Sequence, residues 1–221
     1  MDVAEQVAAG TATERERAVA LHDYVREQVM FGFNQYFDAA PPTYTLACCR
    51  GHCNPKSRLL ATLFRTAGLE SHQHFVVIPK DILEGAIPAS RYWMIPPELS
   101  HSYVEVKVEG EWYAIDSHIV DTPLLLAGQA RLAREGRHLG YGLRIGSTNV
   151  WDGRSDAFSQ FDEKMMIEDH GRVEDLEDYF LSERYRNHVL GLRFNTLFRL
   201  LGERGVAAIN DHIDSVRQQT L

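Results

Sequence analysis

The stretch Gly51–His72, "GHCNPKSRLLATLFRTAGLESH", decides the fold of this chain. Asn54-Pro55 is typical of a helix start, because Asn can cap a helix and Pro is tolerated in its first turn. Gly68 is typical of a helix end. Between them, apolar residues recur at helical spacing: Leu59, Leu60, Leu63, Phe64 and Ala67. We therefore predict a helix from about 54 to 67, with Cys53 at its N-terminus.

The position of Cys53 points to a reactive thiol. Unpaired N–H groups and the helix dipole stabilise a thiolate at a helix N-terminus. The same N–H groups can hold a developing oxyanion, and Gly51 allows the backbone to approach a ligand closely. The alternative interpretation is an ordinary small, buried cysteine. A nucleophilic cysteine also needs a base, and the base needs a group that orients it.

A second stretch, "HSYVEVKVEGEWYAIDSH" (101–118), supplies both groups. Its two alternating runs are joined by Glu109-Gly110, which predicts a β-hairpin. With a two-residue turn, His101, Tyr103 and Asp116 share one face, and His101 lies diagonal to Asp116, within reach of its side chain. A register slip of one residue would move Asp116 to the opposite face.

Together the two stretches resemble the transglutaminase-like superfamily of papain-like cysteine enzymes. In that family Gly-x-Cys opens a helix ending in Arg-x-x-Gly. A strand then begins with His and continues with an aromatic residue and Glu-Val, and a Gly-x-Trp turn leads to Asp. The matching residues, within about 46–120, are Gly51, Cys53, Arg65, Gly68, His101, Tyr103, Glu105, Val106, Gly110, Trp112 and Asp116. Tyr103 stands where the family usually has Trp.

The resemblance implies a cysteine-dependent acyl-transfer enzyme, either an amide or peptide hydrolase or a transglutaminase-type acyltransferase, working through a thioester. By this resemblance Cys53 is the nucleophile, His101 the general base and acid, and Asp116 the orienting carboxylate. The side chain that would stabilise the oxyanion is not identified; Gln35, Tyr44 and Tyr103 are candidates for contacts with the oxyanion or the substrate. No cofactor or metal is expected. The substrate would be a peptide or a small amide or ester.

Two metal sites and a binding module are the competing hypotheses. Cys48 and Cys49 could join Cys53 and His52 as ligands, but structural zinc usually needs a second pair of ligands further along the chain. Otherwise Cys48 and Cys49 are packing residues. His101, Asp116 and His118 could hold iron or zinc on the hairpin. The third possibility is a non-catalytic binding module on the same fold.

The rest of the chain completes an α+β pattern rather than an alternating βαβ one. Thr13 and Glu16 form a capping box that starts a helix over 14–30, and 74–79 reads as a buried strand. The segment 121–180 is loose, and its acidic part, 162–178, is either a solvated surface or a cap for basic substrates. The run 92–97 and Trp151 either pack or line a substrate cleft. Two late helices are marked by Leu190, Phe194, Leu197, Phe198 and Leu201, and by Val206, Ile209, Ile213 and Val216.

We therefore expect one papain-like domain over 1–221, in which a core at about 14–120 carries an extension, 121–221, that packs on it. A central helix should lie on a small antiparallel sheet, with additional C-terminal helices. The chain has 221 residues, 44% of them hydrophobic, and a net charge of −8. This balance disfavours disorder and nucleic-acid binding. No signal peptide or membrane span is evident, so a cytoplasmic location and no membrane partner are expected. The oligomeric state is left open.

Overall fold

The computed structural model describes residues 3–218. Its α-helices are α1 (Val3–Ala8), α2 (Glu14–Gln28), α3 (Pro42–Cys48), α4 (Cys53–Thr66), α5 (Ala89–Tyr92), α6 (Thr122–Glu135), α7 (Leu176–Leu181) and α8 (Phe194–Arg217). Its strands are β1 (Met30–Phe31), β2 (Arg50–Gly51), β3 (Ser71–Pro79), β4 (Glu98–Val108), β5 (Glu111–Ile115), β6 (Leu139–Gly140), β7 (Leu143–Arg144), β8 (Glu168–Arg172), β9 (His188–Val189) and β10 (Leu192–Arg193). Short 3-10 turns lie at Phe37–Ala39, Lys80–Leu83 and Glu163–Met165.

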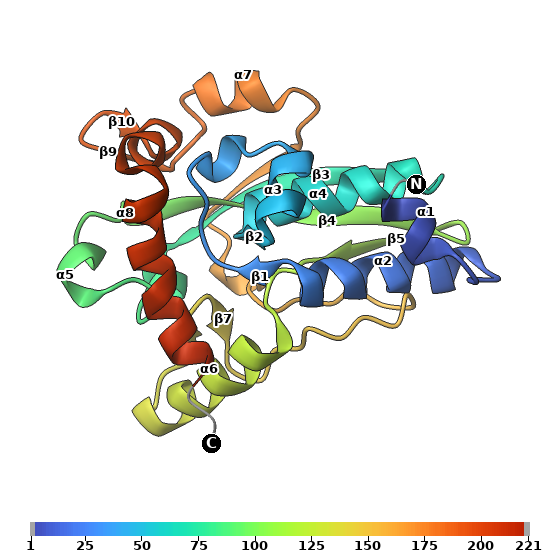
Figure 1. The fold of residues 1–221 in the computed structure, drawn as a ribbon, viewed down its shortest axis with the longest axis horizontal. Coiled ribbons are helices and arrows are strands. Elements are labelled where there is room, and N and C mark those ends of the chain that lie inside the picture. The colour runs from blue at the N-terminus through green and yellow to red at the C-terminus, as the bar shows by residue number, and fades with distance from the viewer. Residues whose placement is uncertain (1–2, 219–221) are drawn as a thin grey trace.

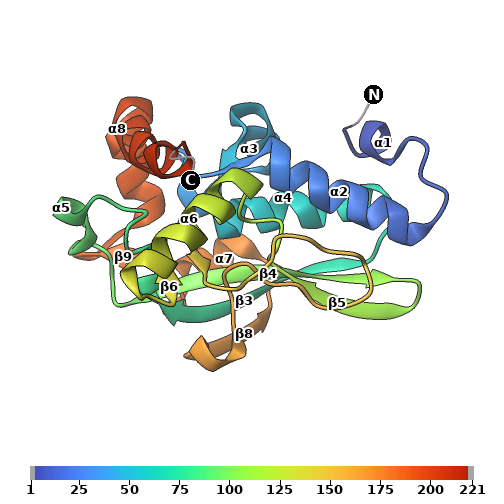
Figure 2. The ribbon, with the colours of Figure 1, turned by 90° about the horizontal axis from the view of Figure 1, so that it is seen from below.

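The centre of the molecule is an antiparallel sheet with the strand order β5-β4-β3-β8. Helices α2 and α4 cover one face of this sheet, as Figure 2 shows. The apolar stripe predicted for α4 supplies Leu59, Leu60 and Leu63 to this layer, where they pack against Val104 and Val106 of β4. The predicted α+β class, with a central helix on a small antiparallel sheet, is confirmed.

The hairpin β4–β5 has the predicted register. Val108 pairs with Glu111, and Val104 pairs with Ile115. Glu109 (φ 53°) and Gly110 (φ 93°) both have positive φ, as a tight two-residue turn of this kind requires. The chain leaves the ladder after Ile115, so the next residue emerges at a strand end.

Helix α4 ends as predicted but begins differently. Gly68 follows its last turn with φ +82°, which is the left-handed conformation expected of a glycine stop. At the other end the capping position is His52, and the prediction that Asn54 caps the helix is wrong. The amide of Asn54 instead donates to the buried carboxylate of Asp38, at 2.7 Å, and to the carbonyl of Ser100.

Helix α2 is fixed locally, as its sequence predicts. The Glu16 N–H donates to the Thr13 hydroxyl at 3.1 Å, and the Glu16 carboxylate accepts the Thr13 N–H at 3.1 Å. Strand β3 contains the predicted 74–79 and begins three residues earlier, at Ser71.

Strand β8 lies in the segment that we read as a solvated surface or a cap. Its sequence, Glu-Asp-His-Gly-Arg, has no apolar alternation, because β8 is an edge strand paired only with β3. Side chains hold it in place: the imidazole of His74 bridges Asp169, at 2.6 Å, and Glu105, at 2.8 Å.

The two late helices form one element, α8, with a break at Gly202 (φ 63°). Leu190 is not part of it. This residue lies in the β9–β10 turn with positive φ and is 90% exposed, so its assignment to the helix was wrong. Helix α8 packs against α6 and the Phe37–Ala39 turn. In Figure 1, α8 crosses one end of the molecule, and the N-terminal end of α4 points toward it. Within residues 3–218, no helix combines the length and apolar character needed to cross a membrane.

Candidate active site

The thiol of Cys53 lies in the first residue of α4 and lines a cavity of about 300 Å³. The residue is half-buried. The backbone N–H groups of Ser102 and Asn54 act on its sulfur in favour of the thiolate and lower the pKa of the thiol. Because Ser102 directly follows His101 in β4, the helix start and the hairpin meet at this point.

Burial decides the protonation state of this thiol. Loss of hydration raises the pKa of Cys53 far above its ordinary value, and the negative charges of Asp38 and Asp116 act in the same direction. The N–H groups of Ser102 and Asn54 act in the opposite direction but do not outweigh burial. The expectation of an ionised thiol at the helix N-terminus is therefore not met, and the thiol is neutral at rest.

The imidazole of His101 and the carboxylate of Asp116 are both buried, and they face each other at the end of the hairpin. His101 Nε2 lies 3.3 Å from Asp116 Oδ2. This is ion-pair distance without hydrogen-bond alignment, since Nε2 has no hydrogen-bond partner. The imidazole ring also stacks on Phe161, with 6.3 Å between the ring centroids. His101 and Cys53 line the same cavity, so the structure brings the three predicted side chains together.

Asp116 is held by a segment that the sequence did not mark as functional. Its carboxylate accepts the backbone N–H groups of Ser159 (2.5 Å), Gln160 (3.1 Å) and Phe161 (2.7 Å), together with the Ser159 hydroxyl (3.2 Å). Consecutive N–H donors of this kind fix the position and orientation of the carboxylate. Residues 159–161 lie in the loose segment, where no periodicity signals their role.

A second buried carboxylate, Asp38, organises the residues that flank Cys53. It accepts hydrogen bonds from His52 Nε2 (2.6 Å), Asn54 Nδ2 (2.7 Å), the Tyr185 hydroxyl (2.5 Å) and Asn187 Nδ2 (2.7 Å). Asp38 therefore ties the start of α4 to the C-terminal part of the chain. We did not identify it from the sequence. The available signal was a lone acid directly after the aromatic run 31–37, since a buried charge needs partners.

The walls of the cavity come from distant parts of the chain. Three segments supply apolar side chains: 31–37, 78–99 and α8. From the run 92–97, Met94 and Ile95 line the cavity, whereas Trp151 is buried in the core between α2 and α4. The polar lining residues other than Arg91 are His52, Ser100, His101, Gln160 and Asn187.

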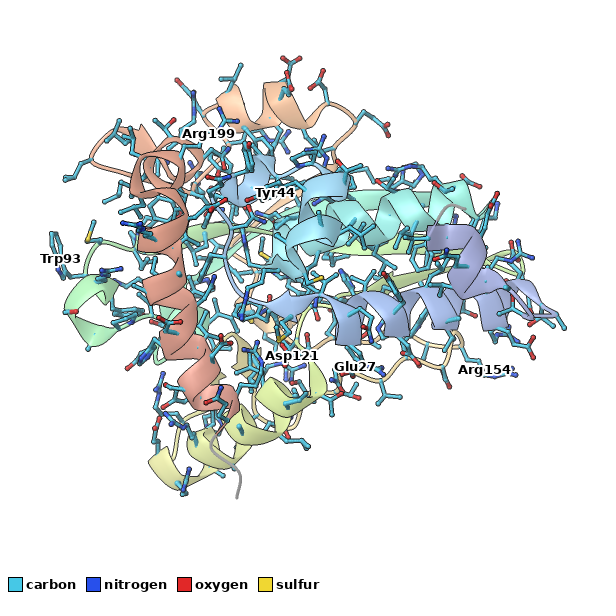
Figure 3. The ribbon with its side chains drawn as sticks, in the orientation of Figure 1. Glu27, Tyr44, Trp93, Asp121, Arg154 and Arg199 are labelled. Atoms are coloured by element: carbon cyan, nitrogen blue, oxygen red, sulfur yellow. The ribbon has the colours of Figure 1, made fainter. Side chains whose placement is uncertain are left out.

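The structure does not bring the proposed oxyanion residues to Cys53. Gln35 donates to the hydroxyl of Tyr44 at 3.1 Å, and neither residue lines the cavity. Tyr44 lies on α3 (Figure 3), where its ring meets Tyr36 edge to face. Tyr103 stacks between His74 and Phe161 and also lies outside the cavity lining.

Neither proposed metal site is supported by the arrangement of side chains. Cys48, Cys49 and Cys53 are free cysteines, and Cys48 and Cys49 do not line the cavity. On the hairpin, His118 turns to the hydroxyl of Ser57, at 3.2 Å. Within residues 3–218, no group of three or more His, Cys, Asp or Glu side chains is arranged to hold a metal ion.

Besides His52 and His101, three further buried bases lie in α4 or close to it: His22, Lys56 and His118. Burial lowers the pKa of each, and that of Lys56 falls to about 7. The Lys56 ammonium donates to the carbonyl of Val29. The sequence did not mark Lys56, because a lysine three residues after Cys53 reads as an ordinary surface residue.

A sequence model of the transglutaminase-like superfamily matches residues 1–117. A search of the curated proteins found no match. Among solved structures, the chain is similar to a "putative protease" from Parabacteroides distasonis ATCC 8503, with 15% identity and a TM-score of 0.36, covering 50% of this chain and 21% of that one. It is also similar to a protein described as a TGase, with 15% identity and a TM-score of 0.35, covering 51% of this chain and 28% of that one. The chain thus spans about a quarter of the length of the structures it matches. The matched residues 1–117 are more than half of the sequence, and this chain belongs to the transglutaminase-like superfamily.

Proposed function

We propose that this protein is a cysteine-dependent acyl-transfer enzyme, acting on an amide or ester as a hydrolase or acyltransferase. One observation carries the proposal. Cys53, His101 and Asp116 come from three separate elements, Cys53 and His101 line one cavity, and His101 lies 3.3 Å from Asp116. Nucleophile, base and orienting carboxylate in this order are the requirements of covalent acyl transfer.

In the proposed reaction His101 takes the proton of the Cys53 thiol while the sulfur attacks the carbonyl carbon of the substrate. The carbonyl oxygen becomes an oxyanion, and the backbone N–H groups of Cys53 and Asn54 in the first turn of α4 stabilise it. The carbon–nitrogen or carbon–oxygen bond then breaks, and the leaving group receives the proton from His101. The product of this half is a thioester on Cys53. Water or an amine then gives a proton to His101 and attacks the thioester carbonyl. The carbon–sulfur bond breaks, and His101 gives the proton to the sulfur of Cys53.

The neutral resting thiol makes the base essential. Because burial raises the pKa of Cys53, little thiolate is present near neutral pH, and the proton must move to His101 as the attack proceeds. Asp116, held by three consecutive backbone N–H groups, stabilises the imidazolium that results. General-base catalysis of this kind contributes typically about 10²–10⁴-fold in rate.

The test measures acylation of Cys53 directly. In a Cys48→Ser/Cys49→Ser background, a 4-nitrophenyl ester should release about one equivalent of nitrophenolate in a burst, and mass spectrometry should locate the acyl group on Cys53. His101→Ala should slow the burst by at least about 10²-fold. The matched control is His72→Ala in β3, a histidine outside the cavity lining, which should leave the burst unchanged. An equal burst in His101→Ala would refute the proposed base, and no acylation of Cys53 would leave the binding-module hypothesis.

A further inference from the structure

We infer that the cavity beside Cys53 binds an uncharged, apolar acyl group of about a dozen non-hydrogen atoms, so that hydrophobic acyl donors are the substrates. This inference rests on the proposed function, because it names the substrate class of the same site. It goes further in using the walls of the cavity, which the catalytic residues do not determine.

The cavity walls offer a buried acyl group almost only apolar contacts. Phe33 and Phe37 face the cavity from one segment, and Phe194, Leu197 and Phe198 face it from α8. Burying apolar area stabilises a bound apolar group by roughly 25 cal/mol per Å². A chain of methylenes or an aromatic ring fits such walls.

Charged acyl groups are disfavoured because most polar groups of the cavity already have partners; the ring nitrogens without one are His52 Nδ1 and His101 Nε2. His52 donates to Asp38, Asn187 donates to Asp38 and to the carbonyl of Ser100, and Gln160 donates to the carbonyl of Gly142. Among the described residues that line the cavity, Arg91 carries a positive charge, and this residue is exposed to solvent. A carboxylate or ammonium deep in the cavity would therefore be desolvated without compensation.

The volume sets the size of the group. An engineered apolar cavity of about 150 Å³ binds benzene, which has six carbon atoms. This cavity has about 300 Å³, and therefore has room for about twelve non-hydrogen atoms. An acetyl group would leave most of it unfilled, whereas a decanoyl group would fill it.

One wall lies outside the residues that match the family. The family match ends at residue 117, whereas Phe194, Leu197, Phe198 and Leu201 come from α8. Leu201 is 40% exposed and lies at the rim, as does Arg91 of α5. In Figures 1 and 2, α5 and α8 lie side by side, and Trp93 projects outward at the end of α5, away from the cavity (Figure 3).

The experiment compares 4-nitrophenyl acetate, butyrate, octanoate and decanoate, all below their critical micelle concentrations. Each methylene buried should raise kcat/KM about fourfold, so octanoate should exceed butyrate about 200-fold. An ester of the same length that ends in a carboxylate should fall back toward the butyrate value. Leu197→Trp, which fills the cavity from α8, should abolish the preference, and Leu197→Ala should move the optimum to longer chains. The matched control is Leu200→Trp on the exposed side of the same helix, where the leucine is 75% exposed, and it should keep the wild-type profile.

A binding measurement separates failure of this inference from failure of the proposed function. Calorimetry on Cys53→Ser, which forms no thioester, should show binding of decanamide and not of acetamide, and Leu197→Trp in the same background should remove it. Acylation of Cys53 with a flat dependence on chain length would overturn the inference and leave the proposed function standing. Decanamide binding without acylation of Cys53 by any ester would overturn the proposed function and support the apolar site. Absence of both would overturn both.

Discussion

Replacing Lys56 with methionine should stabilise the protein near neutral pH. Lys56 is fully buried, one turn after Cys53, and its ammonium donates to the carbonyl of Val29. The carboxylate of Asp121 interacts with this ammonium electrostatically. Asp121 is already paired with Arg217 through two contacts of 2.8 Å, at the start of α6 (Figure 3). Removing Lys56 therefore leaves no carboxylate without a partner.

The expected gain follows from the pKa of Lys56. Burial lowers this pKa from 10.5 to about 7. At about 1.4 kcal/mol per pKa unit, the buried ammonium lowers the free energy of unfolding by about 5 kcal/mol. The full destabilisation is present below pH 7, where Lys56 is protonated in both the folded and the unfolded state. It disappears as the pH rises toward 10.5, where both states become neutral. Methionine removes this destabilisation but leaves the Val29 carbonyl without a donor, which costs about 1–3 kcal/mol. The net gain is about 2–4 kcal/mol at pH 6 and turns into a small loss near pH 10.

Urea unfolding at pH 6, 8 and 10, followed by tryptophan fluorescence, measures the difference in free energy of unfolding. The control is Lys107→Met, which removes a half-exposed ammonium 3.5 Å from Glu70 and should change the stability by less than about 0.5 kcal/mol at each pH. The reasoning would be refuted if Lys56→Met were less stable than wild type at pH 6 and the loss of stability were the same at pH 10.

Three further perturbations test the site and the scaffold. Asp116→Asn places an amide against three backbone N–H donors and removes the charge facing His101, so the ester burst should slow by at least about 10²-fold, measured by stopped flow. Asp38→Ala removes the acceptor that four buried donors share, of which Asn54 and Asn187 keep the Ser100 carbonyl, and should lower the free energy of unfolding by about 3–5 kcal/mol. A melting temperature equal to that of wild type would contradict this. Thr13→Ala removes the cap of α2 and should cost about 1 kcal/mol in urea unfolding, and no loss would show that the capping box is not stabilising.

Buried polar partners were beyond the reach of the sequence. The four donors to Asp38 come from positions up to 149 residues away in the chain, and the N–H groups that hold Asp116 come from 43 to 45 residues away. Periodicity and capping rules describe neighbours within a turn or a strand pair, so neither set leaves a pattern that can be read. Strand β8 was missed for a related reason, since its pairing with β3 is supported by His74 and not by apolar alternation.

The sequence by itself determined the helix after Cys53, the capping box of α2, and the register of the 101–118 hairpin. These features depend on residues a few positions apart, through side-chain periodicity, caps and turn geometry. The placement of Cys53, His101 and Asp116 follows from them together with the resemblance to the family. Only the tertiary structure decided the ionisation of the thiol and the shape of the cavity. The helix N-terminus favours a thiolate, but Cys53 packs against an apolar cluster that includes Phe194 and Phe198 of α8, and loss of hydration is the larger effect.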